Sequence, residues 1–307
     1  TTRDAMASDE DDEELRRAVE ASLVEAEEAA RKKSEEEQLT AQKVEALSAQ
    51  EQDQLTIDQM NSILTDITAS QPMVGDKVAV SELTEEYRLN PQAFAAGIAA
   101  LDKKYSALRR VRKDGNCFYR GFLYRYLEQL VGSDSEELRR MKGVVENCST
   151  KLLSVGYEAS AMEIFWEMFG ELLNEVPTLT KEALHSKMND EQGVSNHVVW
   201  FCRALSATQI KMNAERFAPF VMDENGTADV ETFCRTEVEP VNHECEQVQI
   251  IALTEFLEVP VAIEYLDGSG IPSRLVFPDG SDPVVKLLYR PGHYDILYDD
   301  DAPAAPA

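Results

Sequence analysis

The sequence has few histidines, few cysteines and no long hydrophobic run. It contains four histidines and five cysteines among 307 residues. Five is an odd number, which fits a reducing compartment better than a disulfide framework. No apolar run approaches the length of about 18 residues that a transmembrane helix needs, so we expect no membrane span. The acidic N-terminus does not resemble a signal peptide.

Positive charge is also scarce. The chain has 30 lysines and arginines against 57 aspartates and glutamates, which gives a formal net charge of −27. Nucleic acids bind proteins through lysine and arginine, so this charge argues against a nucleic-acid partner and fits partners with basic faces. We expect the protein to be a monomer. We also expect it in the cytoplasm and in the nucleus.

One cysteine lies directly after a turn and directly before an amphipathic run. Cys117 follows Gly115 and Asn116, and apolar residues recur after it at roughly helical spacing. This spacing places Cys117 at a helix N-terminus, where unpaired amides and the helix dipole favour negative charge. A lowered pKa would make Cys117 a nucleophile at neutral pH. The alternative is a small buried hydrophobic residue, and the local sequence leaves both open.

A nucleophile of this kind needs a base, and His293 is the best placed histidine. Residues 284–290 and 293–298 are predicted strands, and Pro291-Gly292 between them indicates a hairpin turn. Strand side chains alternate, so His293 and Asp295 project from one face. A carboxylate there can bind one imidazole nitrogen and leave the other as a general base. The alternative is a histidine with a structural role only.

Both segments resemble a known family. Residues 114–120 and 289–298 are similar to the two active-site blocks of the otubain branch of the ovarian-tumour (OTU) deubiquitinases. Other stretches resemble the same branch in order and spacing, and the similarity extends from about residue 55 to 298. These stretches are 101–106, 233–240, 250–253 and 276–281.

The resemblance implies a thiol isopeptidase that hydrolyses ubiquitin chains. Cys117 is then the nucleophile, His293 the general base and Asp295 the residue that orients the base. Asp114 matches a position that the family counts with the active site. The thiolate attacks the carbonyl of the C-terminal glycine of ubiquitin, and His293 releases the lysine amine. No metal or organic cofactor is implied.

The same resemblance identifies 114–116 as part of an oxyanion loop, with Gly115 and Asn116 as its members. In the family, Asp114 shapes a loop whose backbone N–H groups stabilise the oxyanion. The residues agree with this interpretation, because glycine permits an unusual backbone geometry next to a forming oxyanion.

The other cysteines are predicted to be packing residues. Cys148, Cys202 and Cys234 have apolar helical neighbours. Cys234, His243 and Cys245 do not match the usual ligand spacing of a zinc site. We therefore expect no metal site.

Composition and pattern predict four segments. Residues 1–54 form an acidic, helix-prone extension, because 9–53 contains 16 acidic and six basic residues without glycine or proline. Residues 55–79 form an arm or linker, 80–299 the OTU catalytic domain, and 300–307 a disordered tail. In otubains the stretch before the domain helps to hold the proximal ubiquitin, so the resemblance implies a preference for chains linked through lysine 48 of ubiquitin.

The expected fold class is α+β, with a helical part followed by an antiparallel sheet. It resembles the papain-like arrangement, in which a cysteine on an early helix faces a histidine on a late strand. The predicted helices are 136–153, 159–175, 197–210 and one that begins near 248. The predicted strands are 260–265, 274–277, 284–290 and 294–298.

A helix predicted at 9–28 resembles a ubiquitin-interacting motif. An acidic run precedes a stripe in which two small residues would let a partner approach the helix closely. The stripe contains Leu15, Ala18, Val19, Ser22 and Ala26. The alternative is a solvated acidic helix.

Three hypotheses on function follow. The first is a cysteine deubiquitinase that binds ubiquitin and polyubiquitin. The second is a non-catalytic inhibitor that binds ubiquitin or ubiquitin-conjugating enzymes, as some otubains do. The third is an unrelated cysteine hydrolase. The presence of Cys117, His293 and Asp295 together favours the first, since a pure binding protein has no need of all three.

Overall fold

The computed structural model describes residues 31–33, 49–221 and 229–299. The chain divides into two compact units, Thr1–Leu64 and Thr65–Ala307, and the division falls within helix α2 (Ala49–Ser70). The helix predicted at 9–28 and the tail at 300–307 lie outside the described residues. The stretch 55–68, predicted as part of an arm, is helical and belongs to α2.

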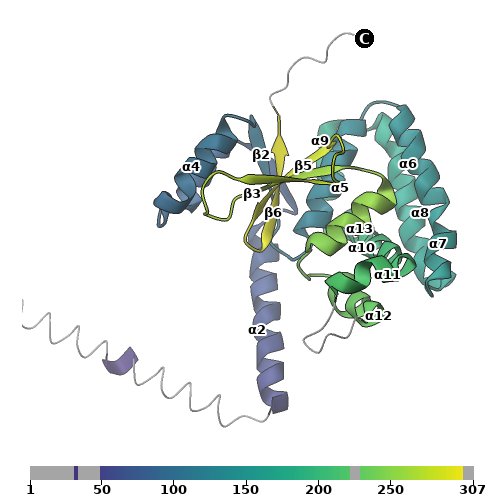
Figure 1. Ribbon diagram of the computed structural model, residues 1–307, viewed down its shortest axis with the longest axis horizontal. Helices are drawn as coiled ribbons and strands as arrows, with labels where there is room; N and C mark the ends of the chain where they lie inside the picture. The colour runs from purple at the N-terminus through teal and green to yellow at the C-terminus, as the bar shows by residue number, and fades with distance from the viewer. Residues whose placement is uncertain (1–30, 34–48, 222–228, 300–307) are drawn as a thin grey trace, which may run out of the picture. The chain divides into compact units, whose positions relative to one another are not determined.

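The second unit contains a six-stranded sheet with the order β1-β2-β6-β5-β3-β4 (Figure 1). Its strands are β1 (Val74–Val78), β2 (Ala107–Val111), β3 (Val261–Tyr265), β4 (Ser273–Phe277), β5 (Val285–Arg290) and β6 (His293–Tyr298). The predicted strands of the C-terminal region are confirmed. The sequence analysis missed β1 and β2, and β1 lies in the stretch that it assigned to the arm.

The predicted purely antiparallel sheet is wrong, because the sheet is mixed. Strand β3 pairs with β4 antiparallel and with β5 parallel. After β4 the chain returns past the end of β3 and places β5 on the other side of that strand. The order of strands along a sequence does not determine which of them become neighbours, so periodicity could not show this parallel pair.

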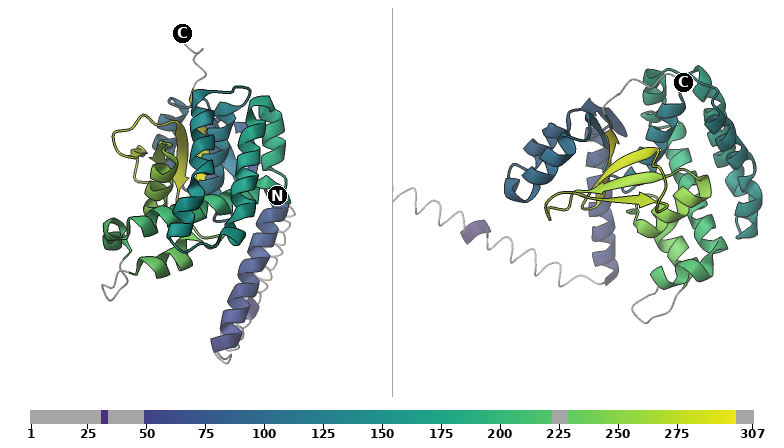
Figure 2. Two further views of the ribbon diagram at one scale, coloured as in Figure 1. Left: turned by 90° about the vertical axis from the view of Figure 1, so that its right-hand side faces the viewer. Right: turned by 45° about the horizontal axis from the view of Figure 1, so that its top comes forward.

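The helices of the second unit lie on both sides of the sheet (Figures 1 and 2). In chain order they are α3 (Leu83–Glu86), α4 (Pro91–Asp102), α5 (Cys117–Leu130), α6 (Glu136–Glu146), α7 (Cys148–Ser154), α8 (Ala159–Glu175), α9 (Lys181–Met188), α10 (Val194–Met212), α11 (Ala214–Phe217), α12 (Val230–Phe233) and α13 (Gln247–Leu257). The helix predicted at 136–153 is two helices, because the chain turns at Asn147 between α6 and α7.

Local sequence explains several helix starts. Ser135 caps α6 by accepting a hydrogen bond from the Leu138 amide, and Thr180 caps α9 in the same way. Pro91 is the first residue of α4, a position where its missing N–H has no intrahelical partner. Helix α5 begins at Cys117, as predicted, although the Asn116 side chain gives it no cap.

The two faces of the sheet are covered by different helices. Strand residues alternate between the faces: Leu287 and Ile296 pack in the core cluster that includes α5, α10 and α13, whereas Leu288 and Leu297 pack against α4. All four are 0–1 % exposed. The sheet is therefore a central layer, and it places the β5–β6 hairpin beside α5.

Candidate active site

Cys117 is the first residue of α5 and is 4 % exposed. Its Sγ accepts a hydrogen bond from the backbone N–H of Tyr294 at 3.4 Å. Tyr294 follows His293 on β6, so this bond ties the start of α5 to the strand that carries the predicted base. The structure thus brings together the two blocks that the sequence analysis selected.

The loop before Cys117 is held by Asp114. Its Oδ1 accepts from the Asn116 backbone amide at 2.9 Å, and its Oδ2 accepts from Arg120 Nη2 at 2.5 Å. Gly115 has a φ of 75°, and a Cβ there would lie 2.3 Å from the carbonyl oxygen of Asn242. Only glycine fits both the backbone conformation and the close approach. The predicted role of Asp114 in shaping the loop agrees with this geometry.

Arg203 fixes the same loop, and sequence reasoning missed it. This arginine of α10 is 0 % exposed. Its Nη2 donates to the carbonyl of Gly115 at 2.9 Å and to that of His243 at 2.6 Å. Its Nε and Nη2 donate to Asn116 Oδ1 at 3.1 and 2.9 Å, and the same oxygen accepts from the Asn242 amide. The Asn116 side chain therefore anchors the loop to Arg203 and Asn242.

His293 and Asp295 form a buried pair on β6, as predicted. His293 Nε2 lies 2.8 Å from Asp295 Oδ1, which also accepts from the Val111 amide at 3.0 Å. Burial would raise the pKa of Asp295, but the hydrogen bond and charge of His293, with the charge of Arg290, hold this pKa at about 2. Asp295 is therefore ionised at neutral pH, and its carboxylate orients the imidazole of His293 through Nε2.

The other nitrogen of His293 has a different environment. Nδ1 is buried and has no hydrogen-bond partner among the residues that the structure describes. A buried polar atom without a partner is uncommon and calls for an explanation. A general base that takes up its proton when substrate binds is one such explanation.

The expected lowered pKa of Cys117 is wrong for this structure. Burial raises the pKa of the thiol to about 12, and the backbone N–H of Tyr294 lowers it by less. The helix N-terminus was predicted correctly, but loss of solvation outweighs its effect on a fully buried sulfur. The site therefore holds a thiol together with a separate buried imidazole.

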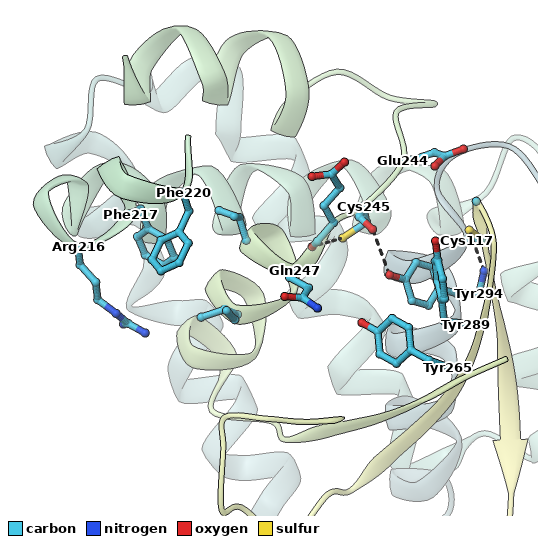
Figure 3. A pocket seen from close by; sticks show the side chains of 14 residues that line it. Cys117, Arg216, Phe217, Phe220, Glu244, Cys245, Gln247, Tyr265, Tyr289 and Tyr294 are labelled. Atoms are coloured by element: carbon cyan, nitrogen blue, oxygen red, sulfur yellow. Dashed lines mark hydrogen bonds between the residues drawn. The ribbon is translucent and has the colours of Figure 1, made fainter. Parts of the chain in front are cut away.

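A cavity of about 560 Å³ opens beside Cys117 (Figure 3). Tyr265, Tyr289 and Tyr294 form one part of its wall near the sulfur, and the Tyr294 hydroxyl donates to the Cys245 carbonyl at 3.2 Å. Gly292 in the hairpin turn lies against Glu244, since a Cβ there would be 2.9 Å from Glu244 Oε1. The sequence analysis did not select these lining residues.

The farther part of the cavity is apolar. Phe217, Phe220, Val248 and Ile251 line it together with Arg216, and Phe220 is 71 % exposed. Figure 3 shows Phe217 and Phe220 well away from Cys117 along the same cavity. The cavity therefore combines a tyrosine-lined end at the thiol with an open hydrophobic end.

The remaining expectations concern metals, disulfides and membranes. Within the described ranges, no group of three or more His, Cys, Asp or Glu side chains could hold a metal ion. All five cysteines are free and buried. No helix in the described part of the chain is long and apolar enough to cross a bilayer. The docking residues Leu15, Ala18, Val19 and Ser22 lie outside the described residues.

Comparison with known proteins gives a consistent result. A family model described as peptidase C65 otubain matches residues 66–299. Human ubiquitin thioesterase OTUB1 is 37% identical over 257 residues, which cover 83% of this chain and 93% of the relative. The ovarian tumor domain-containing deubiquitinating enzyme 1 of Arabidopsis thaliana is 34% identical over 79% of this chain and 86% of its own length.

Solved structures agree with the sequence relatives. An h/ceOTUB1 structure with ubiquitin aldehyde and UBC13~Ub matches with a TM-score of 0.74 at 30% identity, covering 81% of this chain and 99% of that one. A similar structure with UBCH5B~Ub has the same TM-score and identity and covers 98% of its own chain. The residues that the family model matches, 66–299, include the loop at 114–116, α5 and the β5–β6 hairpin.

Proposed function

The chain belongs to the otubain family of cysteine peptidases (peptidase C65), and from this premise we propose that Cys117 and His293 hydrolyse the isopeptide bond between ubiquitin and a lysine. The enzyme is a cysteine-type deubiquitinase. One observation carries the assignment of residues: the backbone amide next to His293 binds the Cys117 sulfur. Base and nucleophile are therefore held at one point, at the end of the tyrosine-lined cavity.

The reaction begins with the proton of the Cys117 thiol. With a pKa of about 12, on the order of one thiol in 10⁵ is ionised at pH 7, so the thiolate must form with the help of a base. His293 Nδ1 accepts the proton as Sγ attacks the carbonyl carbon of the C-terminal glycine of ubiquitin. Asp295 stabilises the resulting imidazolium through Nε2.

The second half of the reaction returns the proton. The tetrahedral intermediate breaks its C–N bond, and His293 Nδ1–H protonates the leaving lysine amine. A thioester between Cys117 and ubiquitin remains. Water attacks the carbonyl carbon of this thioester while Nδ1 takes a proton from the water. The C–S bond then breaks, the ubiquitin carboxylate leaves, and Nδ1–H returns the proton to Sγ. We expect the amide of Cys117, which as the first residue of α5 has no partner within its own helix, to stabilise the oxyanion.

The cavity fits the end of ubiquitin. The C-terminal glycine of ubiquitin has no side chain, so it can lie along the wall that Tyr289 and Tyr294 form, with their ring centroids 5.1 Å apart, and reach Cys117. Glu244, which also lines the cavity, adds a negative charge that suits a partner with a basic face. The open apolar end around Phe220 can receive hydrophobic surface from the body of ubiquitin.

The decisive experiment uses the eight di-ubiquitin linkages and a ubiquitin with a C-terminal electrophile. We expect hydrolysis of at least one linkage and covalent capture by wild type. Both should be lost in Cys117→Ala and kept in Cys148→Ala, which removes a buried cysteine of α7 away from the cavity. Binding of di-ubiquitin without cleavage of any linkage would contradict the enzymatic role of Cys117.

We further propose a preference for chains linked through lysine 48, with α2 as the arm that holds the proximal ubiquitin. Ile63 on α2 is 51 % exposed and offers an apolar contact. Ile63→Asp should slow cleavage of the lysine 48 dimer but spare a ubiquitin substrate with a small leaving group, whereas Thr68→Asp, at an exposed position of the same helix, serves as a charge control. An equal effect of Ile63→Asp on both substrates would argue against the arm.

A second candidate function is binding of ubiquitin-charged conjugating enzymes without turnover. The similar otubain structures contain UBC13~Ub or UBCH5B~Ub, which favours it. It is compatible with catalysis, and Cys117→Ala separates the two. The variant should still inhibit chain synthesis by a charged conjugating enzyme if this binding exists, and unimpeded synthesis would rule it out.

A further inference from the structure

The carboxylate that orients His293 is shared with two arginines. Asp295 is 0 % exposed, and its Oδ2 accepts from Arg290 Nη2 at 2.5 Å. Arg110 Nη1 lies 3.6 Å from the same oxygen. The other oxygen binds His293 and the Val111 amide. Two guanidinium groups beside one buried carboxylate more than offset its negative charge. Without a further anion they would weaken the attraction between Asp295 and the imidazolium form of His293.

Glu86 joins the two arginines from the opposite side. It is the last residue of α3, and its two carboxylate oxygens pair separately with Arg110 and Arg290. The short helix is anchored by Leu83, which is 0 % exposed, and by the residue after Glu86. That residue, Tyr87, stacks on Phe94 of α4 with ring centroids 3.9 Å apart. Two carboxylates and two guanidinium groups therefore alternate in one cluster.

We propose that Glu86 is a positioning residue of the active site. Glu86 holds Arg110 and Arg290 in place and balances their positive charge, so that the negative charge of Asp295 can still stabilise protonated His293. This rests on the proposed role of His293 as general base. With Glu86 present, the two arginines and two carboxylates sum to zero before the imidazole is protonated. Without it, the set carries one positive charge, which opposes an imidazolium.

The charged and titratable groups around the pair come from four elements. Arg290 is on β5, Arg110 on β2, Glu86 on α3 and Cys117 on α5. Asp114, just before α5, and Tyr87, just after α3, also act on the site, through Cys117 and Arg290 respectively. Of these, Glu86 alone contacts both arginines.

Arg290 keeps its charge at every pH that the enzyme meets. Burial opposes the charged form of Arg290, but Asp295 and Glu86 raise the pKa of this arginine above its ordinary value. The Glu86 side chain is 37% exposed, so solvent and salt screen part of its effect. The consequences of its removal are therefore largest at low ionic strength.

Glu86→Gln tests the proposal, with Glu85→Gln as the matched control. Glu85 is an exposed neighbour on the same short helix. The measurement is kcat/KM against pH at low salt with a fluorogenic ubiquitin conjugate. In Glu86→Gln we expect the acidic limb to move to lower pH by roughly 0.5–1 unit, with a several-fold lower kcat and little change in KM. Glu85→Gln should follow wild type.

Two further variants separate charge from fold. Glu86→Asp should recover part of the wild-type profile, and the double variant Glu86→Gln/Arg110→Gln should bring the acidic limb back toward wild type, since it removes the excess cation. Arg110→Gln alone should move the limb to higher pH. A wild-type pH profile in Glu86→Gln, or no shift in Arg110→Gln, would overturn the proposal.

An NMR titration makes the test independent of activity. The chain has four histidines, so the imidazole signal of His293 can be assigned by its loss in His293→Ala. The midpoint of that signal should be lower in Glu86→Gln than in Glu85→Gln. If the midpoint shifts but neither wild type nor any variant cleaves ubiquitin, the proposed function is wrong and the effect of Glu86 on His293 stands. Equal midpoints in folded variants refute the role of Glu86.

Discussion

The backbone amide of Tyr294 donates a hydrogen bond to the sulfur of Cys117, although 177 positions separate the two residues. This contact places the end of the β5–β6 hairpin against the start of α5. The Tyr294 hydroxyl also donates to the Cys245 carbonyl at 3.2 Å. Tyr294 therefore contacts both the nucleophile and the segment around Cys245 that lines the cavity. The position of the base thus depends on how one strand docks on one helix.

His293→Ala should remove most turnover and leave the fold intact. A positioned general base contributes about 10²- to 10⁴-fold to a rate, and Asp295 keeps its bonds to Val111 and Arg290 in the variant. The measurements are kcat on a lysine-linked di-ubiquitin and the thermal unfolding midpoint. His197→Gln, at a histidine of α10 away from the cavity, is the control. Loss of the folded state in His293→Ala would mean that the histidine is structural.

Gly115→Ala should damage both activity and stability. The residue has a φ of 75°, and the new Cβ would lie 2.3 Å from the Asn242 carbonyl, so the loop must move. Gly132→Ala is a matched control, because Gly132 has a φ of 79° and nothing lies within 4 Å of its Cβ position. Both variants should lose about 1 kcal/mol to backbone strain, and only Gly115→Ala should also lose kcat. Similar kcat values for the two would show that the loop geometry is not needed.

Local patterns predicted the elements that carry the proposed chemistry. Helix α5 begins at Cys117, and the hairpin turns at Pro291-Gly292, because glycine with a positive φ and proline before it form a tight turn. The pair of His293 and Asp295 follows from the period of a strand. These features depend on residues close together in the sequence, so the sequence could reveal them.

Features that depend on distant contacts were missed. Strand β2 carries Arg109 and Arg110 between Leu108 and Val111. Two adjacent charged residues break the alternating pattern that predicts a strand, and only the folded structure shows that they pair with carboxylates of other elements. The raised pKa of Cys117 comes from burial beneath residues far away in the chain. Neither the parallel pairing of β3 with β5 nor this burial has a local signal.

Arg203 did leave a signal that could have been used. It lies in an apolar helical run between Cys202 and Ala204, all of which are at most 4 % exposed. A charge at such a position must be paired or fully hydrogen-bonded, so the sequence implied a buried polar network around α10. It could not show that the partners are the carbonyls of Gly115 and His243.

Asp295 should make folding stability depend on pH in acid. Its pKa is about 2 in the folded protein, below that of an unfolded aspartate, so the stabilisation is complete above the unfolded value and is lost as pH falls from about 4 to 2. The shift corresponds to about 2 kcal/mol. Urea unfolding of wild type and Asp295→Asn between pH 2 and 6 measures this difference.

The control for this pH dependence is Asp279→Asn, at an exposed position. The stability difference between wild type and Asp295→Asn should shrink by about 2 kcal/mol as pH falls, because only wild type loses the ionised carboxylate. Asp279→Asn should differ from wild type by a small and constant amount. A pH-independent difference for Asp295→Asn would mean that the charge of Asp295 does not stabilise the fold.

The predicted N-terminal docking helix can be tested apart from catalysis. Ala18→Gly with Ser22→Asp should weaken binding of long ubiquitin chains, because both changes fall on the stripe that would contact ubiquitin. Cleavage of a minimal ubiquitin substrate should be unchanged, since a docking helix acts by raising effective concentration. Ala29→Gly with Ser34→Asp makes similar changes outside the motif. A loss of equal size in binding and in minimal-substrate cleavage would argue against a separate docking site.

Alkylation of the free enzyme measures the state of Cys117 directly. Because burial raises the pKa of its thiol to about 12, the thiolate fraction should increase tenfold per pH unit from 6 to 9, and so should the rate of reaction with iodoacetamide. Mass spectrometry of the peptide that contains Cys117 gives this rate, with the peptide of Cys202, whose pKa burial also raises to about 12, as the buried reference. A rate at Cys117 that reaches a plateau near pH 7 would instead mean that the free enzyme already holds a thiolate. A steady increase would show that Cys117 is a thiol in the free enzyme, so that the thiolate has to form during the reaction.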